Sequence, residues 1–334
     1  MLLSLFILFY YTLFVKVSLP SQKPCTSHNI TCPKVVACPQ VVACPSYGHT
    51  STEFAYIMML KSKVQISIPA QKLVYKNNYQ EFDNLADFNQ MPRILPYIDP
   101  TPSAVFLIGG IDRAQMTLAV AGLISKDIPI HGFEILKSSQ QESSALVAHY
   151  PNVHIHHLAW GEASGMLPEA ATVSMAEWAD ENHVTLSLYT LIDVEGHEPR
   201  VLRGMKLHDL SNQRRFPIVQ YELGGTWAER DKRHYSGSET EQDKRDNRHY
   251  SGSETEWTQK QAAEYMRSNG YELFLIGTNN WMRVDPEFFE EGDHSLDEGF
   301  GRFVQGNLLC LHLHFCPSRI MRHVLQSVAK TYLA

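Results

Sequence analysis

Hydrophobic residues fall into short runs that alternate with helix-like segments from residue 103 onward. Apolar runs of four to eight residues bounded by turn residues are typical of buried strands, and apolar residues spaced three and four apart are typical of amphipathic helices. The pattern predicts strands at 103–108, 130–135, 152–159, 186–193, 217–223, 271–277 and 307–315. It predicts helices at 113–125, 138–149, 173–182, from about 197, and at 258–269.

This repeated alternation of strand and helix predicts an α/β fold with a doubly wound, mainly parallel sheet. The last strand, at 307–315, is expected to run antiparallel to the others. The alternating part is assigned to a domain at 103–320, and the mixed pattern at 51–102 to its N-terminal extension.

The chain begins with an apolar leader, assigned to residues 1–19. Its apolar run ends at Lys16 and is shorter than the roughly 20 residues that a bilayer span needs, so it favours a signal peptide or a short signal anchor. The leader predicts the secretory pathway, either as an endoplasmic reticulum or Golgi membrane protein or as a secreted one. Whether residues 1–19 stay as a membrane tether is left open.

Residues 20–50 form a Cys- and Pro-rich stem. Its cysteines lack the close CxxC spacing of zinc sites, so they favour disulfides in an oxidising compartment, with the pairing left open. An Asn29-Ile30-Thr31 sequon adds a candidate glycosylation site. The four cysteines are Cys25, Cys32, Cys38 and Cys44.

A second polar segment interrupts the domain at 229–256, where RHYSGSETE occurs twice, at 233–241 and 248–256. A duplication with almost no apolar residues indicates an exposed loop rather than core. A substrate lid or a modification site is a less favoured interpretation of the loop.

Composition limits the function. A hydrophobic content of 44% is enough for a sizeable core, and a net charge of −7 argues against general nucleic-acid binding, because phosphates require a basic surface. The expected partner is a small molecule or a glycan; the oligomeric state is left open.

Candidate chemistry gathers at the predicted strand ends, where ligands bind in open α/β sheets. Adjacent glycines allow close backbone approach, and an acid after the second strand is placed to accept hydrogen bonds from a ribose. Taken alone, Glu134 could equally be a solvated strand-end carboxylate, whereas a structural cap is the less favoured interpretation of Asp193 and Glu195. The strand-end residues are Gly109, Gly110, Asp112, Glu134, Ala159, Trp160, Asp193, Glu195, His197 and Glu222.

The stretch LIDVEGHEPRVLRGM, from Leu191 to Met205, resembles the signature of FkbM-type methyltransferases, roughly I-D-V-E-G-x-E followed by V-L-x-G. GFEI, HLAWGEASG, VSMAEWADE, PIVQYEL and GYELFLIG are similar to other segments of that family, so the resemblance covers about 103–310. It implies a class I, Rossmann-like methyltransferase fold and an S-adenosylmethionine cofactor. The expected reaction is O-methylation of a hydroxylated acceptor such as a glycan.

Within this interpretation, the cofactor is expected to contact Gly109, Gly110, Asp112, Glu134, Ala159, Trp160 and Asp193. Asp193, Glu195, His197 and Glu222 are the candidate catalytic residues, because methyl transfer to a hydroxyl needs positioning and a proton acceptor. Glu198 is expected to satisfy backbone N–H groups at the start of the helix.

The sequence gives less support to other functions. The stretch from Leu107 to Arg113 departs from the D-x-G-A-N-x-G pattern usual in the family, which motivates a catalytically inactive binding module as the alternative. A dehydrogenase has little support, because no G-x-G-x-x-G follows the first strand. No metal site is predicted, since the alternating Cys310, His312, His314 and Cys316 would extend about 20 Å along a strand.

Overall fold

The computed structural model describes residues 49–77, 82, 93–98, 104–111, 114–167, 170–223, 257–277, 281–289 and 306–333. The chain divides into two compact units, Met1–Ser46 and Tyr47–Ala334, and every described residue belongs to the second. The predicted leader, all of the stem but its last two residues, the duplicated insertion and Asp112 lie outside the described residues.

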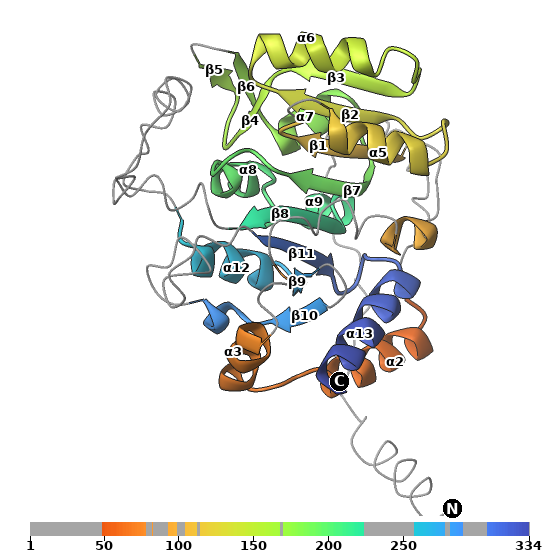
Figure 1. Cartoon of the computed structure of the whole chain (residues 1–334), viewed down its shortest axis with the longest axis vertical. Coiled ribbons are helices and arrows are strands. Elements are labelled where there is room, and N and C mark those ends of the chain that lie inside the picture. The colour runs from red at the N-terminus through yellow and green to blue at the C-terminus, as the bar shows by residue number, and fades with distance from the viewer. Residues whose placement is uncertain are drawn as a thin grey trace, which may run out of the picture. The chain divides into compact units, whose positions relative to one another are not determined.

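An eight-stranded sheet forms the centre of the second unit (Figure 1). Its strand order is β10-β9-β11-β8-β7-β1-β2-β3, and the five strands from β8 to β3 pair in parallel. Those strands are β1 (Ala104–Gly109), β2 (Ile130–Glu134), β3 (Val153–His157), β7 (Leu186–Ile192) and β8 (Ile218–Leu223).

The remaining strands complete the sheet on the far side of β8. β11 (Gly306–His312) lies between β8 and β9 (Tyr271–Ile276) and is antiparallel to both, while β10 (Trp281–Val284) pairs antiparallel with β9. The late antiparallel strand and the doubly wound, mainly parallel sheet are therefore confirmed. This arrangement is that of a Rossmann-like class I methyltransferase fold.

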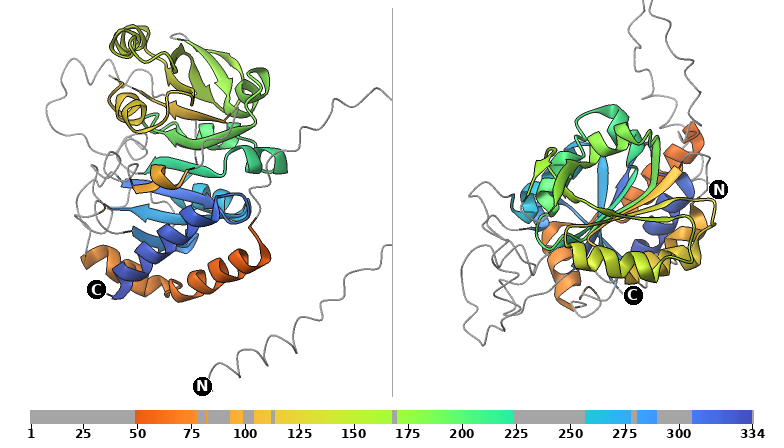
Figure 2. Two further views of the ribbon diagram at one scale, coloured as in Figure 1. Left: turned by 90° about the vertical axis from the view of Figure 1, so that its right-hand side faces the viewer. Right: turned by 90° about the horizontal axis from the view of Figure 1, so that it is seen from above.

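Helices lie on both faces of the sheet (Figure 2). One face packs against α3, α7, α8 and α12, and the other against α2, α5 and α13. The helices are α2 (Ser51–Lys63), α3 (Ile68–Asn77), α5 (Gln115–Leu123), α6 (Lys137–Leu146), α7 (Met175–Glu181), α8 (Glu198–Gly204), α9 (Leu210–Arg215), α12 (Gln259–Ser268) and α13 (Ser318–Leu333), with short 3-10 turns at Leu95–Tyr97 and Pro286–Phe288. None of the helices in the described ranges is long and apolar enough to cross a bilayer.

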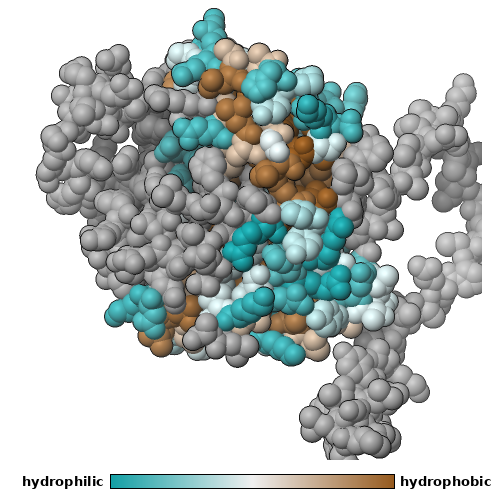
Figure 3. Space-filling view, turned by 45° about the vertical axis from the view of Figure 1, so that its right-hand side comes forward, coloured by the Kyte–Doolittle hydropathy of each residue, from teal (hydrophilic) through white to brown (hydrophobic). Residues whose placement is uncertain are grey.

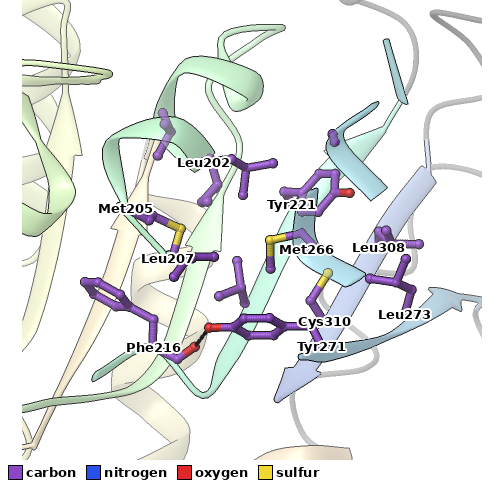
Figure 4. Close-up of a cluster of buried hydrophobic side chains, with 14 of the residues drawn as sticks. Leu202, Met205, Leu207, Phe216, Tyr221, Met266, Tyr271, Leu273, Leu308 and Cys310 are labelled. Atoms are coloured by element: carbon purple, nitrogen blue, oxygen red, sulfur yellow. Dashed lines mark hydrogen bonds between the residues drawn. The ribbon is translucent and has the colours of Figure 1, made fainter. Parts of the chain in front are cut away.

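Two hydrophobic cores result, one on each face, because successive side chains of a strand point to opposite faces. Leu107 belongs to the first core, whereas Phe106 and Ile108 belong to the second. Figure 4 shows part of the first core, in which the Tyr271 hydroxyl donates a 2.7 Å hydrogen bond to the Phe216 carbonyl. On the face shown in Figure 3, a patch of hydrophobic residues lies above the middle of the view, with hydrophilic residues both above and below it.

The predicted strand 152–159 is wrong at its C-terminal end. β3 ends at His157, and Ala159–Gly161 forms β4 of a separate three-stranded sheet in the order β4-β6-β5. β4 leaves the main sheet because its partner is β6 (Ala171–Ser174), which also pairs with β5 (Gly165–Met166). The predicted helix at 173–182 begins later, at Met175, because the Ser174 hydroxyl caps it by accepting a hydrogen bond from the Glu177 amide.

Candidate functional site

The carboxyl ends of β7, β1 and β2 lie side by side and are joined by backbone hydrogen bonds. Gly109 pairs with Phe133 on one side and with Ile192 on the other. The Gly110 amide donates to the Phe133 carbonyl at 3.0 Å, and the Asp193 amide donates to the Gly109 carbonyl at 3.0 Å. The chain winds from β1 to β2 in one direction and reaches β7 in the other, so this is the switch point where such sheets bind ligands.

Glycine is required at position 110. Its φ of +75° lies in the left-handed region, and a Cβ atom there would stand 1.4 Å from the Asp193 carbonyl oxygen. Gly110 therefore lets the turn after β1 contact the turn after β7 directly.

Trp160 covers the other predicted glycine. A Cβ atom on Gly109 would lie 2.3 Å from the Trp160 ring, whose centroid is 4.5 Å from that of Phe133. Trp160 is 5% exposed, and its Nε1 has no hydrogen-bond partner among the described residues. The structure thus brings Trp160 to the predicted site from β4, together with the buried Ala159.

Glu134 ends β2 beside this junction. It is 7% exposed, and its Oε1 accepts a 2.8 Å hydrogen bond from the Leu136 amide. The alternative of a solvated carboxylate is therefore wrong for this acid: Glu134 is buried, and one of its oxygens fixes the turn that follows the strand.

A tight turn links β7 to α8. Glu195 and Gly196 have φ angles of +52° and +86°, and the Glu195 side chain is exposed. His197 is half-buried and immediately precedes α8, which has Pro199 in its first turn. α8 also packs closely on β4, since a Cβ atom on Gly204 would lie 2.0 Å from the Gly161 carbonyl oxygen.

Glu198, the first residue of α8, is completely buried. Its Oε1 accepts a 2.8 Å hydrogen bond from the Val194 amide, which confirms that it satisfies backbone donors. Its Oε2 is buried without a hydrogen-bond partner in the described part of the chain. Burial raises the pKa of Glu198 to about 8, with a further rise from the like charge of Asp193, against the lowering effect of backbone hydrogen bonds.

Three carboxyl groups meet here. One carboxylate oxygen of each of Asp193, Glu198 and Glu222 lies within 4.8 Å of the other two. Asp193 is half-buried, and Glu222, on β8 opposite Asn307, is 6% exposed. We call these three residues the carboxylate cluster. It unites two of the predicted catalytic residues with Glu198, which the sequence analysis treated only as a cap.

The residues at the strand ends are chemically suited to bind the charged and hydroxyl groups of S-adenosylmethionine. That cofactor carries a positive sulfonium, an ammonium group and two ribose hydroxyls, and acidic acceptors at the ends of β2 and β7 flank the glycine turn. The orphaned Glu198 Oε2 also indicates that a cation or a hydrogen-bond donor completes the site.

A cavity of about 10 Å³ lies at the opposite end of the sheet, at the amino ends of β7 and β8, where Leu186 and Ile218 line it. It holds one water molecule at most and is too small for a cofactor.

Comparisons with known proteins give no family assignment. No protein-family model matches the chain, and no curated protein matches it. Among solved structures, methyltransferase FkbM from Methylobacillus flagellatus is 12% identical over 52% of this chain and 48% of its own, with a TM-score of 0.34. This chain therefore spans about half the length of that structure.

Two further structures are matched over their whole length. A SAM-dependent methyltransferase from Aquifex aeolicus is 9% identical over 74% of this chain, with a TM-score of 0.34. A putative caffeoyl-CoA O-methyltransferase from Staphylococcus aureus is 11% identical over 78% of this chain, with a TM-score of 0.35. At such identities and TM-scores, these similarities do not make the chain a member of any of these families.

Proposed function

We propose that this protein is an S-adenosylmethionine-dependent methyltransferase. The observation that carries the proposal is the junction of Gly110 with Asp193 at the switch point of the sheet, flanked by the buried Glu134. The resemblance of residues 191–205 to the FkbM signature supports it, because Asp193, Gly196 and Glu198 all have defined structural roles at this junction.

The cofactor would lie across the ends of β1, β2 and β7. Glu134 would accept hydrogen bonds from ribose hydroxyls, and Asp193 would face a positively charged group of the cofactor. Trp160 would form an apolar wall beside Gly109. Asp112 and Ala159 stay predictions as further cofactor contacts.

When bound, S-adenosylmethionine supplies a methyl group on an electrophilic sulfonium. The chain then has to hold an acceptor hydroxyl in line with that methyl group and to take up the hydroxyl proton. His197, Glu195 and Glu222 are the candidates for the proton acceptor. Glu198 is the least suited at neutral pH, because burial raises its pKa to about 8 and so keeps it protonated.

The proposed acceptor is a hydroxylated molecule such as a glycan. This proposal depends on the secretory-pathway leader and stem predicted at residues 1–50, which suit a lumenal or secreted enzyme. Retention of the leader as a membrane tether belongs to the same proposal.

A binding module without turnover is the second candidate. It is favoured by the contact of Trp160 with Gly109, since that ring occupies the space directly over a residue expected to touch the cofactor. The enzyme requires cofactor binding and methyl transfer, whereas the binding module recognises a ligand or partner and predicts no methyl transfer.

Calorimetric titration of the full chain with S-adenosylmethionine tests the enzyme first, because methyl transfer requires the cofactor to bind. We expect saturable binding that weakens at least about tenfold in Glu134→Gln, because the ribose would lose a charged acceptor. Glu142→Gln, an exposed position on α6, is the matched control and should bind like the unchanged protein. Absence of saturable binding would reject the enzyme and leave the binding module as the remaining candidate.

Transfer of a labelled methyl group from the cofactor to a panel of hydroxylated glycans then separates the two. Label incorporation that is lost in Asp193→Ala supports the enzyme. Binding of cofactor without incorporation into any acceptor supports the binding module.

A further inference from the structure

We propose that the carboxylate cluster of Asp193, Glu198 and Glu222 is a binding site for one divalent cation of the Mg²⁺ or Mn²⁺ type. The site goes beyond the proposed function, because cation binding requires neither cofactor nor methyl transfer.

The spacing of the three carboxyl groups suits a single ion. One oxygen from each lies within 4.8 Å of the other two. Two oxygens on opposite sides of one ion are separated by twice the metal–oxygen distance, about 4 Å for Mg²⁺ and about 5 Å for Ca²⁺. Carboxylate oxygens are also the ligands that hard divalent cations prefer.

Glu198 provides an independent reason to expect a ligand. Its side chain is completely buried, and its Oε2 has no hydrogen-bond partner among the described residues. A buried carboxylate oxygen without a hydrogen-bond partner destabilises the folded state. A cation held between Glu198, Asp193 and Glu222 would remove this cost and the repulsion between the three acids.

The cluster is held in place by three elements of the fold. Asp193 follows β7, Glu198 begins α8, and Glu222 lies on β8, which pairs with β7. The Val194 amide orients the Glu198 carboxyl group through Oε1, as outer-shell donors orient metal ligands. The Asp193 backbone is also packed directly against Gly110 at the end of β1.

A proton shared between two carboxyl groups is the rival explanation. It too would satisfy Glu198, and burial raises the pKa of that carboxyl, which favours a proton at neutral pH. The two explanations differ in one measurable respect: a shared proton gives no saturable binding of a metal ion.

The test is a titration of the chelator-treated full chain, without cofactor, with MgCl₂ and with MnCl₂. Calorimetry measures the affinity and the number of ions, and Mn²⁺ electron paramagnetic resonance measures the bound fraction independently. We expect one ion per chain and an affinity at least about tenfold weaker in Glu198→Gln, which keeps the shape of the side chain but cannot become a carboxylate ligand. Glu142→Gln, which removes an exposed carboxylate on α6, should bind like the unchanged chain.

Glu222→Gln serves as the second variant, and circular dichroism shows whether each variant is folded. If Glu198→Gln does not fold, a folded Glu222→Gln with weakened binding supports the site. Absence of saturable binding of either cation up to millimolar concentration would overturn the proposal, and so would unchanged affinity in the folded variants. Neither result depends on S-adenosylmethionine, so failure here leaves the methyltransferase proposal standing.

Discussion

At the scale of single residues, Gly110 controls how closely β1 and β7 approach. Its backbone lies in the left-handed region at φ +75°, and the Asp193 carbonyl occupies the space where any larger residue would place its Cβ. The predicted reason for a glycine here was close approach to a ligand. The structure instead shows close approach to another strand end, which positions a candidate ligand-binding acid.

Gly110→Ala is therefore expected to destabilise the protein by more than about 2 kcal/mol, because the backbone conformation is strained for alanine and the new methyl group collides with Asp193. Urea unfolding followed by circular dichroism measures the change. Gly122→Ala is the matched control: Gly122 lies on α5 with nothing within 4 Å of its Cβ position, so alanine should stabilise by roughly 0.5–1 kcal/mol. Equal effects at the two positions would contradict the proposed contact.

Glu198 shows the limit of prediction for a single residue. Its place at the helix start follows from the sequence, and the structure confirms it, since Glu198 is the first residue of α8. The sequence does not predict that Glu198 is completely buried or that it lies close to Glu222. Glu222 is on a strand 24 positions later, and only the pairing of strands brings the two acids together. The motif contains two acids, Glu195 and Glu198, and either could have been a site residue. The sequence favoured Glu195, which directly follows the strand, as the candidate catalytic residue.

At the scale of elements, the alternation of strands and helices was predicted well because each element carries its own periodicity. The helices outside the alternating region were not predicted, although α2 had a recognisable signal. Thr50 and Glu53 form a capping box, the typical start of a helix. β4 was misassigned to the preceding strand because a segment of three residues, Ala159–Gly161, is too short for its hydrophobic pattern to show which sheet it joins.

The link between the N-terminal helices and the far edge of the sheet is a buried ionic network. Arg283 on β10 is 1% exposed; it donates to Glu272 at 3.0 Å and, through two nitrogens, to Asp285 at 2.9 Å. Lys61 of α2 and Arg267 of α12 also pair with Glu272. Five elements or turns therefore share one set of charges.

Arg283→Met should destabilise the protein by about 3 kcal/mol or more, because it leaves Asp285 and the buried Glu272 without their central cation. Denaturant unfolding provides the measurement. Glu162→Gln breaks the Arg203 pair at 2.7 Å, where the Glu162 side chain is 57% exposed, and should cost less than about 1 kcal/mol. If Arg283→Met lowered the free energy of unfolding only slightly, the ion pairs of Arg283 would contribute little to stability beyond the packing of its side chain.

At the scale of the whole molecule, aromatic and histidine side chains connect the outer edge of the sheet with the candidate site. His131 of β2 and His156 of β3 are joined by a 3.0 Å hydrogen bond, and the His131 ring is also stacked on His154. His156 in turn stacks on Phe133, which contacts Trp160. Protonation of this group would place charge beside the first hydrophobic core.

Stability should therefore decrease as the pH falls through the histidine range. Burial, reinforced by His156 and His154, lowers the pKa of His131 to about 4, whereas an unfolded histidine titrates near 6.5. Above pH 6.5 both states are neutral at this position, and between 6.5 and 4 the unfolded state takes up a proton that the folded state does not. The contribution of His131 is thus present above pH 6.5 and is lost toward pH 4.

The comparison of unchanged protein with His131→Asn measures this contribution, because Glu198 and the other acids affect both profiles alike. We expect the free energy of unfolding of the unchanged protein to fall more steeply from pH 6.5 to 4.5 than that of His131→Asn. His183→Asn, at an exposed left-handed turn position, is the control and should keep the original slope. Parallel profiles for all three proteins would contradict the prediction.

The sequence by itself determined the doubly wound sheet, the order of its elements and the acids and glycines at the strand ends, because these depend on local periodicity and turn chemistry. Only the tertiary structure decided that Trp160 lies over Gly109, that Gly110 touches Asp193, and that Asp193, Glu198 and Glu222 form one cluster. Trp160, Asp193 and Glu222 each meet residues far from them in the chain, and those distances depend on strand order and packing, which no local pattern encodes.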